Sequence, residues 1–383
     1  MPDAPPILSN TPGSFPWSVL HDRHPALIAK VRAGLPYPPD HQRALDDLAT
    51  EITDAIGPLP ADAHDRPTWT DRSRGYLGER WYDVPFLWAE SYFYRKLLDA
   101  VGYFAAGPWH GVDPFEPFKS AELASPELAA DLAALDGLAA LPAGEQDAAL
   151  LAASLWGNRA DLGFQLSARG GDGAARELVA DDGARLWALL ADTAPGTVCI
   201  VADNAARELV PDLVLAAHLL DTGRASAVTV HVKPYPYYVS DATTADLLAA
   251  LRRLAGATGR AAAIGDRLWQ ATVDGSLSVR AHGFSCAPWS YHRMPADVAA
   301  EFAAASVTIM KGDLNYRRLV GDQAWQATTP FDEVTSYFPG PVAALRTLKC
   351  DVVTGVAGDV LARLDATGED WRTSGTHALV QVR

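Results

Sequence analysis

The sequence is poor in cysteine and contains no long apolar run. Its three cysteines, Cys199, Cys286 and Cys350, are odd in number and far apart along 383 residues, so they predict no disulfide framework. No apolar run approaches the ~18 residues that a membrane span requires. The first residues lack the basic and apolar regions of a signal peptide. We therefore expect a cytoplasmic protein that does not enter a membrane.

Basic residues are also scarce. Lys and Arg together number 32, Asp and Glu number 47, and the formal net charge is −15. Proteins that bind nucleic acid normally present a basic face, and no run rich in Lys or Arg occurs in this sequence. We therefore expect no nucleic-acid partner, although a local group of cations could still bind one small phosphate.

The chain divides into two halves of different pattern. Prolines crowd the first 40 residues, and helical patterns follow to about residue 170. From Asp181 short β-branched runs alternate with helical patterns, as in a parallel sheet with helices on both faces. We predict an N-terminal helical lobe with a proline-rich leader over residues 1–175 and an α/β domain over residues 176–383. The predicted fold class is a three-layer α/β/α sandwich with a mostly parallel, Rossmann-like sheet. Its expected strands are Val198–Val201, Ala227–Val232, Leu277–Ala281, Val307–Met310, Leu348–Val353 and Leu379–Val382.

The most informative stretch runs from Val198 to Glu208. A short apolar run ends at Val201, Asp203 and Asn204 follow, and a helical pattern begins after them. Ligands of open α/β sheets bind beyond the carboxyl ends of the strands. The oxygen atoms of Asp203 and Asn204 suit a divalent cation such as Mg or Mn. Both residue types are also favoured helix N-caps, so this stretch alone leaves the two interpretations open.

Later strand ends repeat this arrangement of polar residues. Asp241 follows the next predicted strand and could cap a helix or add a second carboxylate to a metal site. Lys311 and Gly312 follow a further strand and offer a phosphate a positive charge, a close backbone approach and a helix N-terminus. Lys349 enters another strand, where a charge requires a partner. Each motif alone could be a solvated turn, but together they indicate a phosphate and metal site at one edge of the sheet.

The helical half offers candidates for the opposite wall of such a site. The helix predicted over Phe86–Gly102 is apolar around most of its circumference, so Glu90 and Arg95 are expected to be buried. They could form a structural ion pair or face the metal. Asn158 lies in a segment whose Gly and Asn are poor helix formers. We expect Glu90 and Arg95, together with Asn158, to approach the site from this side.

These motifs together resemble the damage-control phosphatase family, formerly a domain of unknown function, and within it the acidic residue methyltransferase 1-like branch. The resemblance runs from about Trp81 to Val353, and its specific motifs are Lys-Gly-Asp-Leu-Asn-Tyr at 311–316 and Arg-Thr-x-Lys at 346–349. Ala206 departs from the family, which often has glycine there. The resemblance implies a metal, Mn or else Co, Ni or Mg, held by Asp203, Asn204 and Asp241. It also implies substrate contacts from Glu208, Lys311, Gly312, Asp313, Leu314, Asn315 and Lys349.

The family reaction is the hydrolysis of small phosphate monoesters, with fructose 1-phosphate and fructose 6-phosphate among the substrates that the resemblance implies. Phosphoryl transfer requires charge on the phosphoryl oxygens to be neutralised, and a metal with Lys311 and Lys349 would do this. The attacking group could be a water that the metal activates or Asp203 as a covalent nucleophile. The sequence leaves both routes open.

Two other functions are compatible with parts of the sequence. The branch name suggests a carboxyl methyltransferase that uses S-adenosylmethionine, but Val201 is followed by no glycine-rich turn of the kind that nucleotide cofactors usually meet. A non-catalytic sugar-phosphate-binding protein would keep the pocket without turnover, and a complete metal-binding set argues against it. We therefore expect a metal-dependent phosphatase.

Overall fold

A seven-stranded sheet forms the centre of the computed structural model, which describes residues 4–157 and 177–383. The strand order is β1-β7-β6-β5-β2-β3-β4. Neighbouring strands pair in parallel except β6 and β7, and β1 pairs with β7 alone. The strands are β1 Glu177–Asp181, β2 Gly196–Val201, β3 Ala225–Val232, β4 Leu277–Ala281, β5 Val307–Lys311, β6 Val342–Thr347 and β7 His377–Val382.

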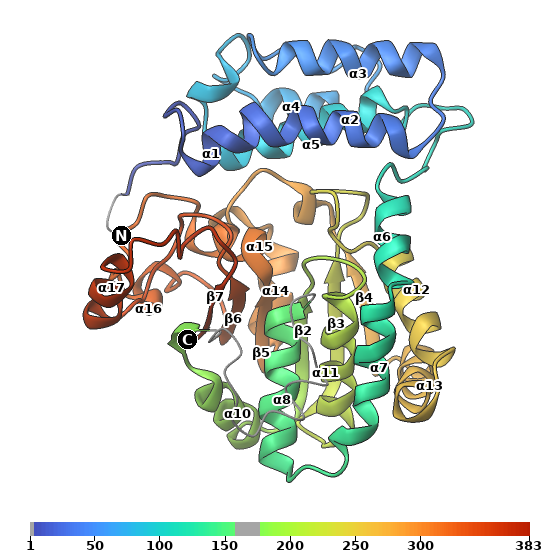
Figure 1. Ribbon diagram of the computed structural model, residues 1–383, viewed down its shortest axis with the longest axis vertical. Helices are drawn as coiled ribbons and strands as arrows, with labels where there is room; N and C mark the ends of the chain where they lie inside the picture. Colours follow the sequence, from blue (N-terminus) through green and yellow to red (C-terminus); the bar gives the residue numbers. More distant parts are fainter. Residues whose placement is uncertain (1–3, 158–176) are drawn as a thin grey trace.

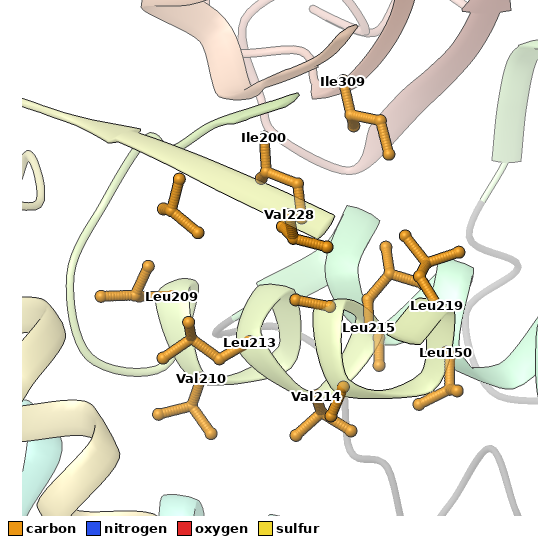
Figure 2. Packing of buried hydrophobic residues seen from close by; sticks show 14 of the residues in the cluster. Leu150, Ile200, Leu209, Val210, Leu213, Val214, Leu215, Leu219, Val228 and Ile309 are labelled. Carbon is orange, nitrogen blue, oxygen red and sulfur yellow. The ribbon is translucent and has the colours of Figure 1, made fainter. Parts of the chain in front are cut away.

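Helices cover both faces of this sheet, and the central strands are therefore apolar along their length. On one face α8 and α11 pack side by side against the sheet, with Leu213 and Leu215 of α11 among the buried side chains (Figure 2). The bounds of the helices around the sheet are α6 Glu116–Leu123, α7 Pro126–Leu138, α8 Ala143–Trp156, α10 Gly183–Asp192, α11 Leu209–Asp221, α12 Thr244–Ala255, α13 Gly259–Asp274, α14 Ala296–Ala304, α15 Gly312–Val320, α16 Phe331–Val334 and α17 Gly358–Asp365.

The first part of the chain forms a separate layer of helices beside one end of the sheet (Figure 1). An aromatic-rich core, including Trp69, Trp88 and Phe93, holds this layer together. Its members are α1 Phe15–Ser18, the π-helix η1 Val19–Arg23, α2 His24–Gly34, α3 Pro39–Glu51, α4 Arg66–Arg72, the 3₁₀-helix η2 Trp81–Asp83 and α5 Phe86–Ala100.

The packing of α7 and α8 differs from the boundary expected at residue 175. Leu132 of α7 and Leu150 of α8 belong to the same buried cluster as Ile200 in the sheet. The layer of helices that packs apart from the sheet therefore ends before α6, which leads from it along the side of the α/β part (Figure 1). The alanine- and leucine-rich composition of these helices predicts their helical form but does not show which core they join.

The predicted fold class is confirmed, and two strands differ from expectation. The strand predicted over Leu348–Val353 is wrong, because β6 ends at Thr347 and a loop follows. The apolar run that begins at Val342 forms the strand instead, which leaves Lys349 just beyond its carboxyl end. Strand β1 was not predicted. Among the described residues no helix is both long and apolar enough to cross a membrane.

Candidate active site at the carboxyl edge of the sheet

Four adjacent strands end at one cavity. Strands β6, β5, β2 and β3 are neighbours and run in parallel, so their carboxyl ends meet at the same edge. The segments that follow them bring one set of polar side chains together, namely Lys349, Asp313, Asp203 with Asn204, and Asp241. The cavity has a volume of about 520 Å³ and is closed on its other side by α1, η1, α2 and α5. This size suits a small organic ligand.

Hydrogen bonds between two loops hold the three predicted metal ligands close together. The Ala242 N–H donates to the carbonyl oxygen of Asp203 at 2.8 Å, and Asn204 and Asp241 form an isolated antiparallel bridge. The hydroxyl of Ser240 donates to Asn204 Oδ1 at 2.7 Å. The β3–α12 loop is thus fastened back onto the end of β2, and this brings Asp203, Asn204 and Asp241 together as predicted.

Left-handed backbone conformations occur on both sides of this contact. Ala206 has φ 53°, Tyr238 has φ 46° and Val239 has φ 65°. Non-glycine residues adopt this region at a cost of about 1–3 kcal/mol each, and such residues cluster at functional sites. Ala206 is the position at which the resembled family often has glycine, and its positive φ gives the physical reason for that preference.

The two carboxylates lie in a place that disfavours their charge. Burial raises the pKa of Asp203 well above its ordinary value, and the charges of Glu208 and Asp241 raise it further. Burial also raises the pKa of Asp241 to about 6, against the effect of Lys233, whose Nζ lies 3.4 Å from Asp241 Oδ2. That oxygen is buried, and among the described residues it has the Lys233 ammonium beside it but no hydrogen bond of good geometry. A divalent cation would stabilise the negative charge of two carboxylates that lie this close together.

The proposed ligand set contains two carboxylates and one amide. Within residues 4–157 and 177–383 no group of three or more His, Cys, Asp or Glu side chains is placed to hold a metal ion. The set of Asp203, Asn204 and Asp241 is not such a group, because its third member supplies an amide oxygen. Its oxygen-only chemistry still fits Mg or Mn, which accept carboxylate and carbonyl donors.

Gly312 makes room for Asp203. It is the first residue of α15, and its φ of +79° lies in the left-handed region. A Cβ atom at this position would lie 1.9 Å from Asp203 Oδ2. The Asp203 carboxylate therefore sits directly against the first turn of α15, where free N–H groups favour anions.

Lys349 is oriented by two acidic neighbours. Its backbone N–H donates to Asp313 Oδ1 at 3.2 Å, and its Nζ lies 3.4 Å from Glu208 Oε1. Burial opposes its charge, but Glu208 and Asp203 outweigh burial and raise the pKa of Lys349. Arg346 binds the same Asp313 oxygen at 2.8 Å. A Cβ atom on Gly157 would lie 2.6 Å from the Glu208 side chain, so the end of α8 supports this contact.

The structure does not place Lys311 or Asn315 in the cavity. Side chains alternate along a strand, and Lys311 shares the face of Val307 and Ile309, which lies under α8 and α11. The Lys311 ammonium there donates to the carbonyl oxygen of Ser154 and lies 3.1 Å from Asp212. The Asn315 amide donates to the carbonyl oxygens of Lys311 and Ala202. Both residues fasten the strand ends behind the site, so the expectation that they contact substrate is corrected.

Glu90 lines the cavity as expected, but its partner is not Arg95. The Glu90 carboxylate accepts a hydrogen bond from Arg317 at 2.6 Å, and Arg317 also binds Asp322. Burial raises the pKa of Glu90 to about 7, although the Arg317 charge opposes the rise. Arg95 lies away from the cavity, where it binds Asp65 and Asp99. Asn158 lies outside the described residues.

Sequence reasoning missed the part of the cavity wall that residues 15–30 form. The side chains that line it recur at helical spacing on one continuous helix, namely Phe15, Val19, Arg23, His24, Ala26, Leu27 and Lys30. Pro16 and Pro25 lie in the first turns of α1 and α2, where proline is tolerated, so they do not break this helix. The spacing of 19, 23, 26, 27 and 30 is the signal that could have found this wall.

The chain is similar to known proteins. A family model described as the damage-control phosphatase ARMT1-like domain matches residues 19–364. The chain is 29% identical over 440 residues to the damage-control phosphatase ARMT1 of Mus musculus, covering 100% of this chain and 99% of that protein. It is 30% identical over 437 residues to that of Xenopus laevis, covering 97% and 96%. A crystal structure of a DUF89 family protein from Pyrococcus horikoshii has a TM-score of 0.51 at 16% identity, covering 91% of this chain and 94% of that chain, so the two share a fold. The chain therefore belongs to the damage-control phosphatase ARMT1-like domain family.

Proposed function

We propose that this protein is a metal-dependent phosphatase that hydrolyses small phosphate monoesters, with sugar phosphates such as fructose 1-phosphate or fructose 6-phosphate as substrates. The observation that carries the proposal is the meeting of Asp203, Asn204, Asp241 and Lys349 in one cavity at the carboxyl edge of the sheet. Membership of a family of damage-control phosphatases supports the reaction class.

Asp203, Asn204 and Asp241 would hold the cation, for which we propose Mn²⁺. When bound, it would neutralise charge on the phosphoryl oxygens and lower the pKa of a nearby water. Two observations support this assignment. Asp241 Oδ2 is buried with the Lys233 ammonium 3.4 Å away but has no hydrogen bond of good geometry among the described residues, and the pKa of Asp203 is raised. A bound cation would stabilise the negative charge of both carboxylates.

The phosphate would lie between Lys349 and the first turn of α15. The N–H groups at the start of this nine-residue helix provide donors and the favourable end of the helix dipole. Lys349 is a cationic side chain on the α/β side of the cavity whose ammonium lies 3.4 Å from Glu208, whereas Lys311 is buried against Asp212. An incoming phosphate would compete with Glu208 for Lys349.

The sugar would face the helical wall. Glu90, Tyr94 and Ser240 line this part of the cavity and offer hydrogen-bond partners for hydroxyl groups. Because polar groups left unpaired in a closed site are costly, such contacts favour a polyol over an apolar ester.

The attacking group is either a water molecule or the Asp203 carboxylate. Borohydride trapping during turnover distinguishes them, because it converts an acyl phosphate at Asp203 into homoserine, which mass spectrometry detects. Finding unmodified Asp203 under conditions that trap a control aspartyl phosphatase would favour water.

The central test measures release of phosphate and binding of Mn²⁺ by the same variants. Asp203→Asn and Asp241→Asn should each abolish measurable turnover of fructose 1-phosphate and weaken Mn²⁺ binding in calorimetry. Asp297→Asn, at an exposed position of α14, serves as the matched control. Full turnover by metal-stripped protein, or unchanged Mn²⁺ affinity in both variants, would contradict the proposal. Methyl transfer from labelled S-adenosylmethionine, without phosphate release, would favour the methyltransferase alternative.

A further inference from the structure

Two cations on the helical wall make no ion pair within the described residues. Arg23 and Lys30 both line the cavity, and both are exposed. The Arg23 guanidinium lies 4.8 Å from the centre of the Phe15 ring, and Lys30 Nζ lies 4.1 Å from that of Phe118. Cation–π contacts hold each charge in place without neutralising it. Both charges therefore remain available to an anion in the cavity.

The backbone of this helix aims Arg23 at the site. Residues 19–23 form a π-helical turn between α1 and α2, closed by a bond from the His24 N–H to the Val19 carbonyl oxygen. A π turn changes the phase of a helix, and such turns often occur at functional sites. Arg23 ends the turn, and its charge lowers the pKa of the buried Tyr94, which burial and the charges of Glu90 and Asp241 raise. The charge of Arg23 and that of the metal-side carboxylate Asp241 thus shift the pKa of the same phenol in opposite directions.

We propose that Arg23 and Lys30 form a second anion subsite across the cavity from the proposed metal site. The inference rests on the proposed phosphatase function and adds a substrate class to it, namely sugar phosphates that carry a second anionic group, either a phosphate or a carboxylate. The two residues are seven positions apart, or roughly 10 Å along the helix axis, so they span the distal part of the cavity. The first anionic group meets Lys349 and α15, and the second meets Arg23 and Lys30.

The rest of the protein would oppose such a ligand without these two residues. The chain has a net charge of −15, and Glu90, Asp203, Asp241 and Asp313 all line the same cavity. A ligand with two anionic groups needs cations at both ends. Arg317 lines the cavity too, but Glu90 and Asp322 already neutralise it.

The test compares two matched pairs of substrates on the Mn²⁺-supplemented protein. The pairs are fructose 1-phosphate with fructose 1,6-bisphosphate, and glucose 1-phosphate with glucuronate 1-phosphate, so that the second group is a phosphate or a carboxylate. We expect the doubly anionic member of at least one pair to have the higher kcat/KM. Arg23→Gln and Lys30→Gln should each lower kcat/KM for that doubly anionic member by at least about fivefold and leave kcat/KM for the singly anionic member within about twofold of wild type. Arg43→Gln, on the exposed side of α3, is the matched control.

Three results would overturn the inference. One is the absence of preference for a second anion in either pair. Another is an equal loss of kcat/KM for all substrates in the two variants that disappears at high salt, because such a loss indicates only long-range electrostatic steering. The third is an unchanged preference in the Arg23→Gln, Lys30→Gln double variant. If the wild-type protein hydrolyses none of the esters, the phosphatase proposal fails separately, and calorimetric binding of the same pairs to wild type and the double variant decides the subsite.

Discussion

Replacing Gly312 by alanine tests the position of Asp203 most directly. The new Cβ would lie 1.9 Å from Asp203 Oδ2 and 2.1 Å from its Cγ, which no pair of atoms tolerates. The Asp203 carboxylate must therefore move, and the proposed metal site loses the placement of one ligand. We expect Mn²⁺ affinity to fall by at least about tenfold and turnover to fall with it.

The expected loss of stability has two parts that a control separates. Alanine in the left-handed region costs about 1–2 kcal/mol, and the overlap with Asp203 adds about 1–3 kcal/mol. Gly321 ends the same helix with φ +102°, and a Cβ there would meet nothing closer than 3.5 Å. Gly321→Ala should therefore lose only the backbone part, about 1–2 kcal/mol, and keep its Mn²⁺ affinity.

Chemical denaturation in the presence of chelator gives both stabilities free of any contribution from bound metal. Calorimetry with Mn²⁺ then measures affinity on the folded proteins. Equal losses of stability in the two variants, together with equal Mn²⁺ affinity, would refute the placement of Asp203 against the start of α15.

Three further outcomes follow from the site and its surroundings. Lys349→Met should lower kcat/KM for a sugar phosphate by roughly 10- to 150-fold at saturating metal, and a value within twofold of wild type would show that the phosphate is held elsewhere. Lys311→Met should lower the free energy of unfolding by about 3 kcal/mol, because it removes the cation that pairs with the buried Asp212, yet leave KM within about threefold. A large rise in KM with normal stability would contradict the structural role of Lys311. Burial lowers the pKa of His24 to about 3, so the neutral ring stabilises the fold above pH ~6.5 and this contribution is lost as pH falls toward 3, by up to about 1.4 kcal/mol per pH unit. His24→Leu should remove that slope from urea denaturation measured between pH 7 and pH 4, and an unchanged slope would show that other groups cause it.

The sequence predicted which chain positions lie at the site better than it predicted which way their side chains point. Asp203, Asp241 and Gly312 follow short apolar runs, and the alternation of strand and helix places such positions at one edge of a parallel sheet. Lys311 also follows such an apolar run, but it is the last residue of β5. Because neighbouring residues of a strand face opposite sides of the sheet, a shift of one position decides whether its side chain faces the cavity or the core. Its orientation depends on which face of β5 packs under α8, and sequence periodicity does not show this.

The helical wall could not be assembled from local patterns in the same way. Arg95 and Glu90 lie on one buried helix, but their partners Asp65 and Arg317 come from distant segments. Ion pairs of this kind depend on tertiary packing, which no spacing rule fixes. The proline-rich leader gave a similar difficulty, because Pro16 and Pro25 start helical segments rather than interrupt them.

The pairing of β1 with β7 alone affects how the protein is made. About 195 residues separate the two strands, and β7 lies between β1 and β6 in the sheet. At about 5–20 residues per second, a ribosome needs roughly 10–40 s to deliver β7 after β1 has emerged. Throughout that time β1 has no strand to pair with, and once β6 has formed its edge beside the active site stays open until β7 follows. Unpaired edges of this kind invite pairing with other chains, so we expect the nascent protein to depend on chaperones until residues 377–382 have left the exit tunnel.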